Sequence, residues 1–88
     1  MTYFKEIDHT KVHRMITDNH IPQTYFARRL KVENSKGKLV SRSTQQINRC
    51  LIGGVGKALL EKITLSLIAY MKRKYGAEKL SLKYFYKD

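Results

Sequence analysis

The sequence predicts a small, mainly α-helical domain with short terminal β-strands and one basic hairpin. Apolar side chains recur at helical spacing in four segments of the chain. Residues that favour the beginning or the end of a helix stand at the borders of those segments. Between LKV and KLV, the residues NSKG at 34–37 are typical of a tight turn. With 88 residues, we expect one domain over 1–88 with a single core.

The first two helices are expected at TKVHRMITDN (10–19) and QTYFARRL (23–30). Val12, Met15 and Ile16 share one face of the first helix, which Asp8 or Thr10 can cap. Asn19 or His20 can end it, because Asn tolerates the left-handed conformation at a helix end. Pro22 fits the first turn of the second helix, where its missing N–H has no partner in any case. The inward face of the second helix is predicted to be Phe26, Ala27 and Leu30.

The third and fourth helices are expected at QQINRCLI (45–52) and KALLEKITLSLIAYMKRKY (57–75). Ser43 or Thr44 can cap the third helix, and the glycines of GGVG (53–56) can end it. Its apolar stripe is Ile47, Cys50 and Leu51. Gly76 ends the fourth helix, whose apolar stripe is too wide for packing against one neighbour. Part of that stripe is therefore expected to form a homodimer interface.

The two ends of the chain have the composition and periodicity of strands. TYFKEI (2–7) is rich in β-forming residues, and KLSLKYFYK (79–87) alternates Leu80, Leu82, Tyr84 and Tyr86 on one side. These strands leave a second arrangement open, an α+β sandwich with the order strand, helix, hairpin, helix, strand. In that arrangement TYFARRLKVE (24–33) pairs with GKLVSRS (37–43).

The charge of the chain indicates a polyanionic partner. Eighteen Lys and Arg residues stand against seven Asp and Glu residues, which gives a formal net charge of +11. From Arg28 to Arg49 there are seven basic residues and one acid, Glu33. Nucleic acid is the first expectation for a small domain of this kind, ahead of an acidic protein or a membrane surface.

The single cysteine, Cys50, excludes an internal disulfide and a multi-cysteine metal site, and it fits a reducing compartment. The N-terminal residues MTYFKEIDHTK contain no apolar stretch that resembles a signal peptide. The most apolar run, LSLIAYM (65–71), is too short to span a bilayer. We therefore expect a cytoplasmic protein, free or associated with the nucleoid, without a membrane partner.

No residue pattern indicates catalysis. The sequence has neither a catalytic carboxylate pair nor a nucleophile with an identifiable base, so we expect no enzyme, no cofactor and no small-molecule substrate. His9 and His13 are spaced as a metal pair on a helix but lack a third ligand. GGVG lacks the Lys-Ser/Thr ending of a phosphate-binding loop and is expected to be a hinge. Tyr84, Phe85 and Tyr86 fit an edge strand or a dimer contact better than the stacking of unpaired bases.

The stretch IPQTYFARRLKV (21–32) has the features of the second helix of a helix-turn-helix. That helix requires a small residue where it crosses its partner, and Ala27 supplies one between larger apolar neighbours. At the front of the helix, Gln23 and Thr24 can hydrogen-bond a phosphate oxygen, and Arg28 and Arg29 add positive charge.

The third helix of such a motif presents short polar side chains to the major groove. STQQINRCLIGG (43–54) does so, with a polar face formed by Thr44, Gln45, Asn48 and Arg49. Gln and Asn can make paired hydrogen bonds to adenine, Arg can do so to guanine, and the Thr methyl can contact thymine.

VHRMITDNHIPQTYFARRLKV (12–32) and STQQINRCLIGG (43–54), in that order, resemble the helix-turn-helix of the lambdoid phage Cro and repressor family. The resemblance implies a dimeric, sequence-specific regulator of transcription that binds double-stranded DNA and comes from a phage or mobile element. It places Thr44, Gln45, Asn48 and Arg49 at base edges. It places Gln23 at a phosphate, and Ser43 at a phosphate or base near the helix start.

The chain departs from that family between the two helices. The family joins them by a turn of about four residues, whereas ENSKGKLVSR (33–42) adds roughly ten. Either this segment is an added basic hairpin, with Lys36, Lys38 and Arg42 as phosphate contacts, or it breaks the geometry of the motif. The second reading of the function is a small α+β module that binds RNA or single strands, or a phage-type inhibitor that binds a partner protein.

Overall fold

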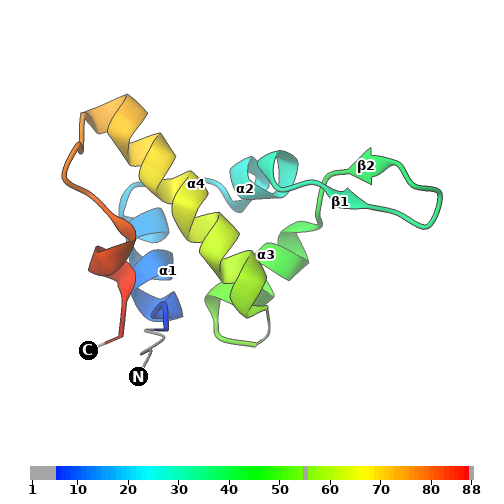
Figure 1. Ribbon diagram of the computed structural model, residues 1–88, viewed down its shortest axis with the longest axis horizontal. Helices are drawn as coiled ribbons and strands as arrows, with labels where there is room; N and C mark the ends of the chain where they lie inside the picture. The colour runs from blue at the N-terminus through cyan, green and yellow to red at the C-terminus, as the bar shows by residue number, and fades with distance from the viewer. Residues whose placement is uncertain (1–5, 55, 88) are drawn as a thin grey trace, which may run out of the picture.

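The computed structural model describes residues 6–54 and 56–87, and within them the chain is mainly helical. The elements follow in the order α1 (His9–Asp18), α2 (Gln23–Arg29), β1 (Val32–Glu33), β2 (Leu39–Val40), α3 (Thr44–Leu51), α4 (Lys57–Tyr75) and the 3₁₀ helix η1 (Leu82–Phe85). Figure 1 shows the long helix α4 running diagonally between α1 and α2 toward α3, and the hairpin of β1 and β2 projecting away from the helices. The prediction of a mainly α-helical fold with short strands is confirmed.

The borders of α1 follow from its capping residues. The Asp8 side chain accepts a hydrogen bond from the backbone N–H of Thr10 at 2.9 Å, which satisfies one of the unpaired donors of the first turn. After Asp18 the chain turns at Asn19 and at His20, whose φ of 55° lies in the left-handed region. Asn19 also donates from its side chain to the Met15 carbonyl at 2.8 Å, which fixes the end of the helix.

α2 begins after Pro22, which takes an extended conformation with φ −70° and is the N-cap rather than part of the first turn. Phe26 and Ala27 are buried and Leu30 is half-buried, as the sequence predicts. Because the residues from 24 to 29 are helical, the α+β sandwich is wrong: that arrangement needs the same residues in a strand.

The hairpin prediction is confirmed. β1 pairs antiparallel with β2, with Val32 opposite Val40 and Glu33 opposite Leu39. The Asn34 side chain accepts hydrogen bonds from the backbone N–H groups of Lys36 at 2.9 Å and Lys38 at 3.0 Å. Gly37 follows with φ 77°, a conformation that glycine adopts without steric strain. These bonds shape the tip of a hairpin that is otherwise only two residue pairs long.

α3 and α4 begin and end at or within one residue of the predicted borders. The Ser43 hydroxyl accepts a hydrogen bond from the Gln46 N–H at 3.2 Å and caps α3. α4 ends at Gly76, where φ is 65° and the backbone N–H bonds to the Lys72 carbonyl.

One apolar core joins all the helices. Its largest fully buried side chains come from α2, α3, α4 and η1, and they include Phe26, Ile47, Leu51, Ile63, Leu67 and Phe85. Thr64 is a buried polar residue of α4, and its hydroxyl donates to the Leu60 carbonyl at 2.7 Å. α2 and α3 pack against each other, and α1 and α4 both contact α3. α3 is therefore held in place on its inner side by three other helices.

The predicted C-terminal strand is wrong. Leu82–Phe85 is a 3₁₀ helix, which turns Phe85 into the core while its neighbour Tyr84 remains exposed. The alternation from Leu80 to Tyr86 therefore does not correspond to two faces of a strand.

The terminal pairing is limited to one antiparallel bridge between Ile7 and Tyr86. Two backbone hydrogen bonds flank it, from the Asp8 N–H to the Phe85 carbonyl and from the Lys87 N–H to the Glu6 carbonyl. Of the N-terminal strand predicted at 2–7, residues 2–5 lie outside the described residues.

Most of the wide apolar stripe of α4 is used inside the chain. Leu60, Ile63, Leu67 and Ile68 are buried, whereas Leu65 is 50% exposed. The part of the stripe that remains exposed is therefore narrower than the sequence indicates. In the part of the chain that the structure describes, no helix is long and apolar enough to cross a membrane.

Tyr84 and Phe85 offer a matched pair for testing the anchoring of the C-terminal segment. Phe85→Ala is expected to lower the free energy of unfolding by about 3–5 kcal/mol, because it leaves a cavity in the core. Tyr84→Ala removes only an exposed ring and its edge contact to Phe85, and we expect a loss below about 1.5 kcal/mol. Urea unfolding followed by circular dichroism measures both, and equal losses would contradict the burial of Phe85.

Glu6 joins the two ends of the described chain to α4. Its carboxylate lies 2.8 Å from the Lys57 ammonium and 3.0 Å from that of Lys87. These two hydrogen-bonded cations lower the pKa of Glu6 from 4.5 to about 2. A depressed folded-state pKa means that the ion pairs stabilise the fold above pH 4.5 and are lost as the pH falls toward 2.

Glu6→Gln is therefore expected to lower the melting temperature at pH 7, with a difference from wild type that closes between pH 4.5 and 2. Melting curves across this range test the expectation. Glu78→Gln, at an exposed carboxyl elsewhere on the chain, is the control and should show no such closing difference. A constant difference for Glu6→Gln at every pH would contradict the ion-pair explanation.

Candidate nucleic-acid interface

α3 has one buried face and one polar face that is open to solvent. Ile47 and Leu51 are fully buried, and Cys50 is 2% exposed. On the other side, the four residues predicted to read bases are all exposed: Thr44, Gln45, Asn48 and Arg49. Gln46, which the sequence reasoning did not include, is exposed as well. The polar face thus offers amide, hydroxyl and guanidinium groups from a helix whose inner side is fixed by the core.

The start of α2 lies beside the polar face of α3. The Gln23 side-chain amide donates a hydrogen bond to the Asn48 side-chain carbonyl at 3.2 Å. The sequence assigned Gln23 to a phosphate and Asn48 to a base edge, and the structure brings these two predicted residues together across 25 positions of sequence. Thr24, the next residue of α2, is exposed.

The long connection between α2 and α3 does not separate the two helices. Residues 30–43 leave α2, form the hairpin and return, and the backbone N–H of Arg42 donates to the Ala27 carbonyl at 2.9 Å. This bond brings the residue before the cap of α3 back to the last turn of α2. The hairpin is thus an addition between two helices that pack together, and the short connection of the fold lies instead between α1 and α2, at residues 19–22.

Arg42 differs from the other predicted phosphate contacts, because it is half-buried. Its Nε is buried and has no hydrogen-bond partner among the described residues. Its positive charge lies close enough to Cys50 to act on the pKa of that thiol, although burial dominates and raises it. Arg42 is therefore turned partly inward, since its backbone is tied to Ala27, and Cys50 is a core residue rather than a reactive thiol.

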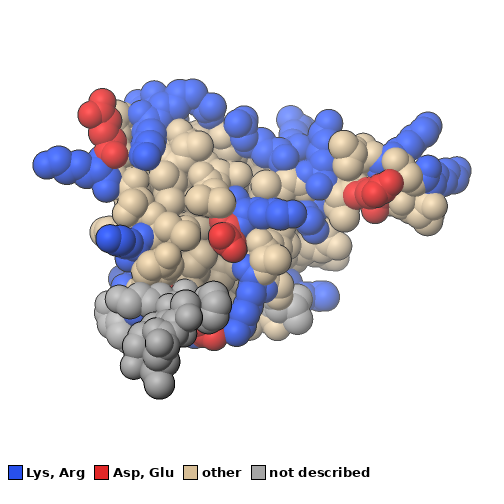
Figure 2. Space-filling model, in the orientation of Figure 1, with Lys and Arg blue, Asp and Glu red and all other residues tan. Residues whose placement is uncertain are grey.

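The remaining predicted phosphate contacts are exposed or lie near the surface. Arg28 and Arg29 are exposed on the last turn of α2, and Lys36 and Lys38 are exposed on the hairpin. Ser43 is exposed too, with its hydroxyl engaged in capping α3. In Figure 2, basic side chains follow the upper rim of the molecule from the end of α4, over α2, to the tip of the hairpin.

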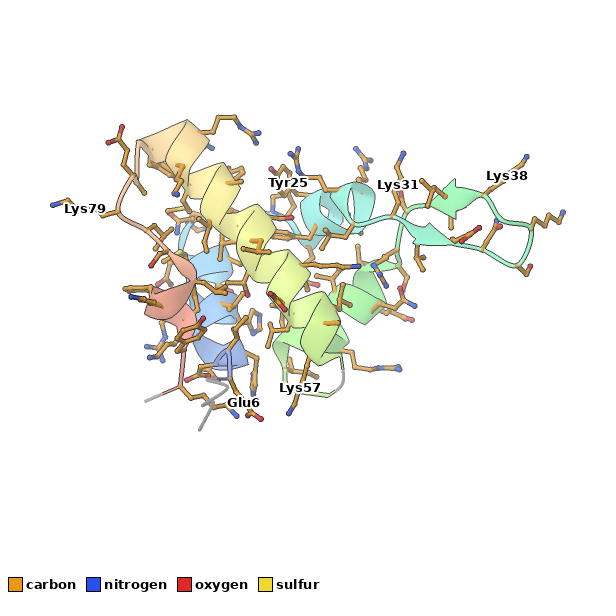
Figure 3. The ribbon with its side chains drawn as sticks, in the orientation of Figure 1. Glu6, Tyr25, Lys31, Lys38, Lys57 and Lys79 are labelled. Atoms are coloured by element: carbon orange, nitrogen blue, oxygen red, sulfur yellow. The ribbon has the colours of Figure 1, made fainter. Side chains whose placement is uncertain are left out.

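Several residues of this rim were not predicted from the sequence. Lys31 is exposed between α2 and the hairpin, and Figure 3 shows its side chain pointing outward. Arg73 and Lys74, in the last turn of α4, are exposed and are held by tyrosine hydroxyl groups. Arg73 donates to Tyr25 at 2.9 Å, and Lys74 donates to Tyr70 at 3.0 Å. The sequence signal is the basic run KRK at 72–74, near the end of the helix predicted at 57–75.

Few carboxylates neutralise these cations. Within the described ranges 6–54 and 56–87, both ion pairs involve Glu6, which contacts Lys57 and Lys87. In Figure 3, Glu6 and Lys57 lie at the opposite side of the molecule from Lys31 and Tyr25. Within those ranges, no carboxylate forms an ion pair with the cations of the rim or of α3.

A hydrogen bond holds the His9 ring against the end of α3. Nδ1 of His9 lies 2.9 Å from the Leu51 carbonyl, and because a carbonyl can only accept, this nitrogen carries the hydrogen. Gly53 leaves room for the His9 ring, because a Cβ atom at position 53 would lie only 2.6 Å from Nε2 of His9. Among the described residues, no group of three His, Cys, Asp or Glu side chains could hold a metal ion.

A polar helix face, a neighbouring helix start and a projecting basic hairpin thus lie on one small scaffold. A comparison of the chain with family models, curated proteins and solved structures finds no match.

Proposed function

We propose that the protein is a sequence-specific regulator that binds double-stranded DNA, with α3 in the major groove. The observation that carries the proposal is the exposed polar face of α3, which is hydrogen-bonded to the start of α2 through Asn48 and Gln23. A helix of this kind fits the width of the major groove, and its amide and guanidinium groups match the donor and acceptor pattern of base edges.

The energetic roles of the residues follow from their positions. Affinity comes mainly from phosphate neutralisation by exposed cations such as Arg28, Lys36 and Lys38, with release of counterions. Specificity comes from Gln45, Asn48 and Arg49 at base edges, with a Thr44 methyl contact to thymine. Gln23 is close enough to Asn48 to orient its side chain while it contacts a phosphate.

The proposal includes a homodimer, which would bind a two-fold symmetric site with half-sites about one helical turn apart. The structure leaves less exposed apolar surface on α4 for a dimer interface than the sequence indicates, because most of the α4 stripe packs within one chain. The exposed apolar residues that a second copy could cover include Leu65 and Ile52, which are 50% and 60% exposed.

The alternative is a basic module that binds RNA, single strands or an acidic protein. The feature that favours it is the projecting hairpin, which carries the exposed apolar residue Leu39 beside Lys38. A flexible single strand can wrap around such a projection and a protein can offer a groove for it, whereas a stiff duplex cannot bend around it.

Selection from random pools separates the two functions. The protein is incubated with random duplexes and with random single strands at two salt concentrations, and the retained molecules are sequenced. We expect a duplex motif, with two-fold symmetry if the protein is a dimer. Salt-sensitive retention without any motif would contradict base reading by α3, and no retention of either pool would point to a protein partner.

Arg49→Ala and Lys36→Ala distinguish a residue that reads base edges from one that neutralises phosphate charge. Arg49→Ala is expected to weaken binding to the selected site by roughly 1–3 kcal/mol and to relax the preference at one base position. Lys36→Ala is expected to weaken binding to all duplexes about equally. It should also make the slope of log K against log salt shallower by about one. Titrations with the selected duplex and with variants of each base measure both effects. If the two variants behave alike, α3 does not read bases.

A further inference from the structure

Three cations from two helices surround a pair of tyrosines where α2 meets the end of α4. The Tyr25 and Tyr70 rings contact each other edge to face, with centroids 5.2 Å apart. The Arg29 guanidinium carbon lies 5.1 Å from the Tyr25 centroid, and Arg73 donates to the hydroxyl of that same tyrosine. Lys74 donates to the Tyr70 hydroxyl and lies 5.4 Å from its ring centroid. We call Arg29, Arg73, Lys74, Tyr25 and Tyr70 the cation–tyrosine cluster.

The cluster brings like charges together without a carboxylate to balance them. Two guanidinium groups share Tyr25, one from α2 and one from α4, and in the described chain both ion pairs are made by Glu6. Like charges held close together repel and destabilise the fold. The rings offset part of this repulsion through cation–π attraction, which is worth about 0.5–1 kcal/mol at an exposed site.

A role in helix capping explains only part of the arrangement. Basic residues in the last turn of a helix interact favourably with its dipole, and this accounts for a positive charge at Arg73 or Lys74. Arg29, in the last turn of α2, can interact in the same way with the dipole of its own helix. The dipoles do not account for the hydrogen bond by which Arg73 of α4 reaches across to Tyr25 of α2, the residue whose ring Arg29 also contacts. Cations from two helices are thus directed to one tyrosine.

We propose that the cation–tyrosine cluster is a second phosphate-binding site, which holds the backbone of the same DNA duplex outside the segment that α3 reads. This inference rests on the function proposed above. The cluster belongs to the basic rim that continues over α2 and Lys31 to the hairpin (Figures 2 and 3), so a duplex lying along the rim meets cations from three elements. Its contacts are to phosphates and carry no sequence information.

The tyrosines act as positioning residues in this site. A flexible arginine or lysine loses side-chain entropy when it orders on a phosphate. The Tyr25 and Tyr70 hydroxyls already hold Arg73 and Lys74 in place before the partner arrives. Each guanidinium or ammonium group keeps further N–H donors for a phosphate oxygen.

The test compares two double variants with the same net charge. Arg73→Gln with Lys74→Gln removes two cations of the cluster. Lys79→Gln with Lys83→Gln removes two exposed cations from the C-terminal segment, and Figure 3 shows Lys79 at the opposite end of the molecule from the hairpin. Affinity for a random-sequence duplex is measured by fluorescence anisotropy over a range of salt concentrations.

For the cluster variant we expect binding at about 0.1 M salt to weaken by about tenfold or more, and the slope of log K against log salt to become shallower by about 1.8. For the control variant we expect a change below about threefold. The same weakening should be found with the duplex selected for sequence, since phosphate contacts act on all duplexes.

The outcomes separate this inference from the proposed function. If the wild-type protein binds duplexes and the two double variants bind alike, the second phosphate site is wrong and the function of α3 stands. If the wild-type protein binds no duplex at all, the proposed function fails and this inference fails with it. If the cluster variant loses affinity for single strands but keeps its affinity for duplexes, the assignment of the site to a duplex is overturned.

Discussion

The backbone hydrogen bond from Arg42 to Ala27 is the constraint on which the arrangement of the site depends. It closes the segment of residues 30–43 at its base, so the chain that leaves α2 returns to the end of the same helix. Phe26 and Ala27 can then remain buried on α2 while Ile47 and Leu51 are buried on α3. Without this closure, the entropy of a long connection would oppose the packing of the two helices.

That constraint also determines which side chains face solvent. With Ile47, Cys50 and Leu51 held in the core, the helical repeat turns Asn48 and Arg49 outward. The same closure draws the Arg42 side chain partly inward and leaves the lysines of the hairpin exposed. The polar face of α3 and the exposed lysines of the hairpin therefore result from one packing arrangement.

The local structure could be predicted from the sequence where a single residue controls it. Asp8, Ser43 and Gly76 define helix ends through short-range hydrogen bonds or a left-handed backbone. The sequence predicts Gly76 outright, and it predicts Asp8 and Ser43 each as one of two candidate caps. The C-terminal strand was mispredicted because the alternation of Leu80 to Tyr86 does not reveal that Phe85 fills the core.

Of the candidate site, the polar face of α3 was predictable from helical periodicity. The hydrogen bond between Gln23 and Asn48 and the inward turn of Arg42 were not, since both result from contacts between separate elements. The cation–tyrosine cluster was missed for the same reason: Tyr25 and Arg73 are 48 positions apart.

The closed base of the hairpin has a consequence for how sequences of this kind can diverge. Residues beyond the pair Val32 and Val40 take no part in joining α2 to α3, so the length of the hairpin is independent of the helix arrangement. Insertions and deletions in pairs preserve which side of each strand a residue occupies, whereas a single added residue exchanges the two sides. The reach of the hairpin can therefore change in steps of two residues without displacing the helices that form the core.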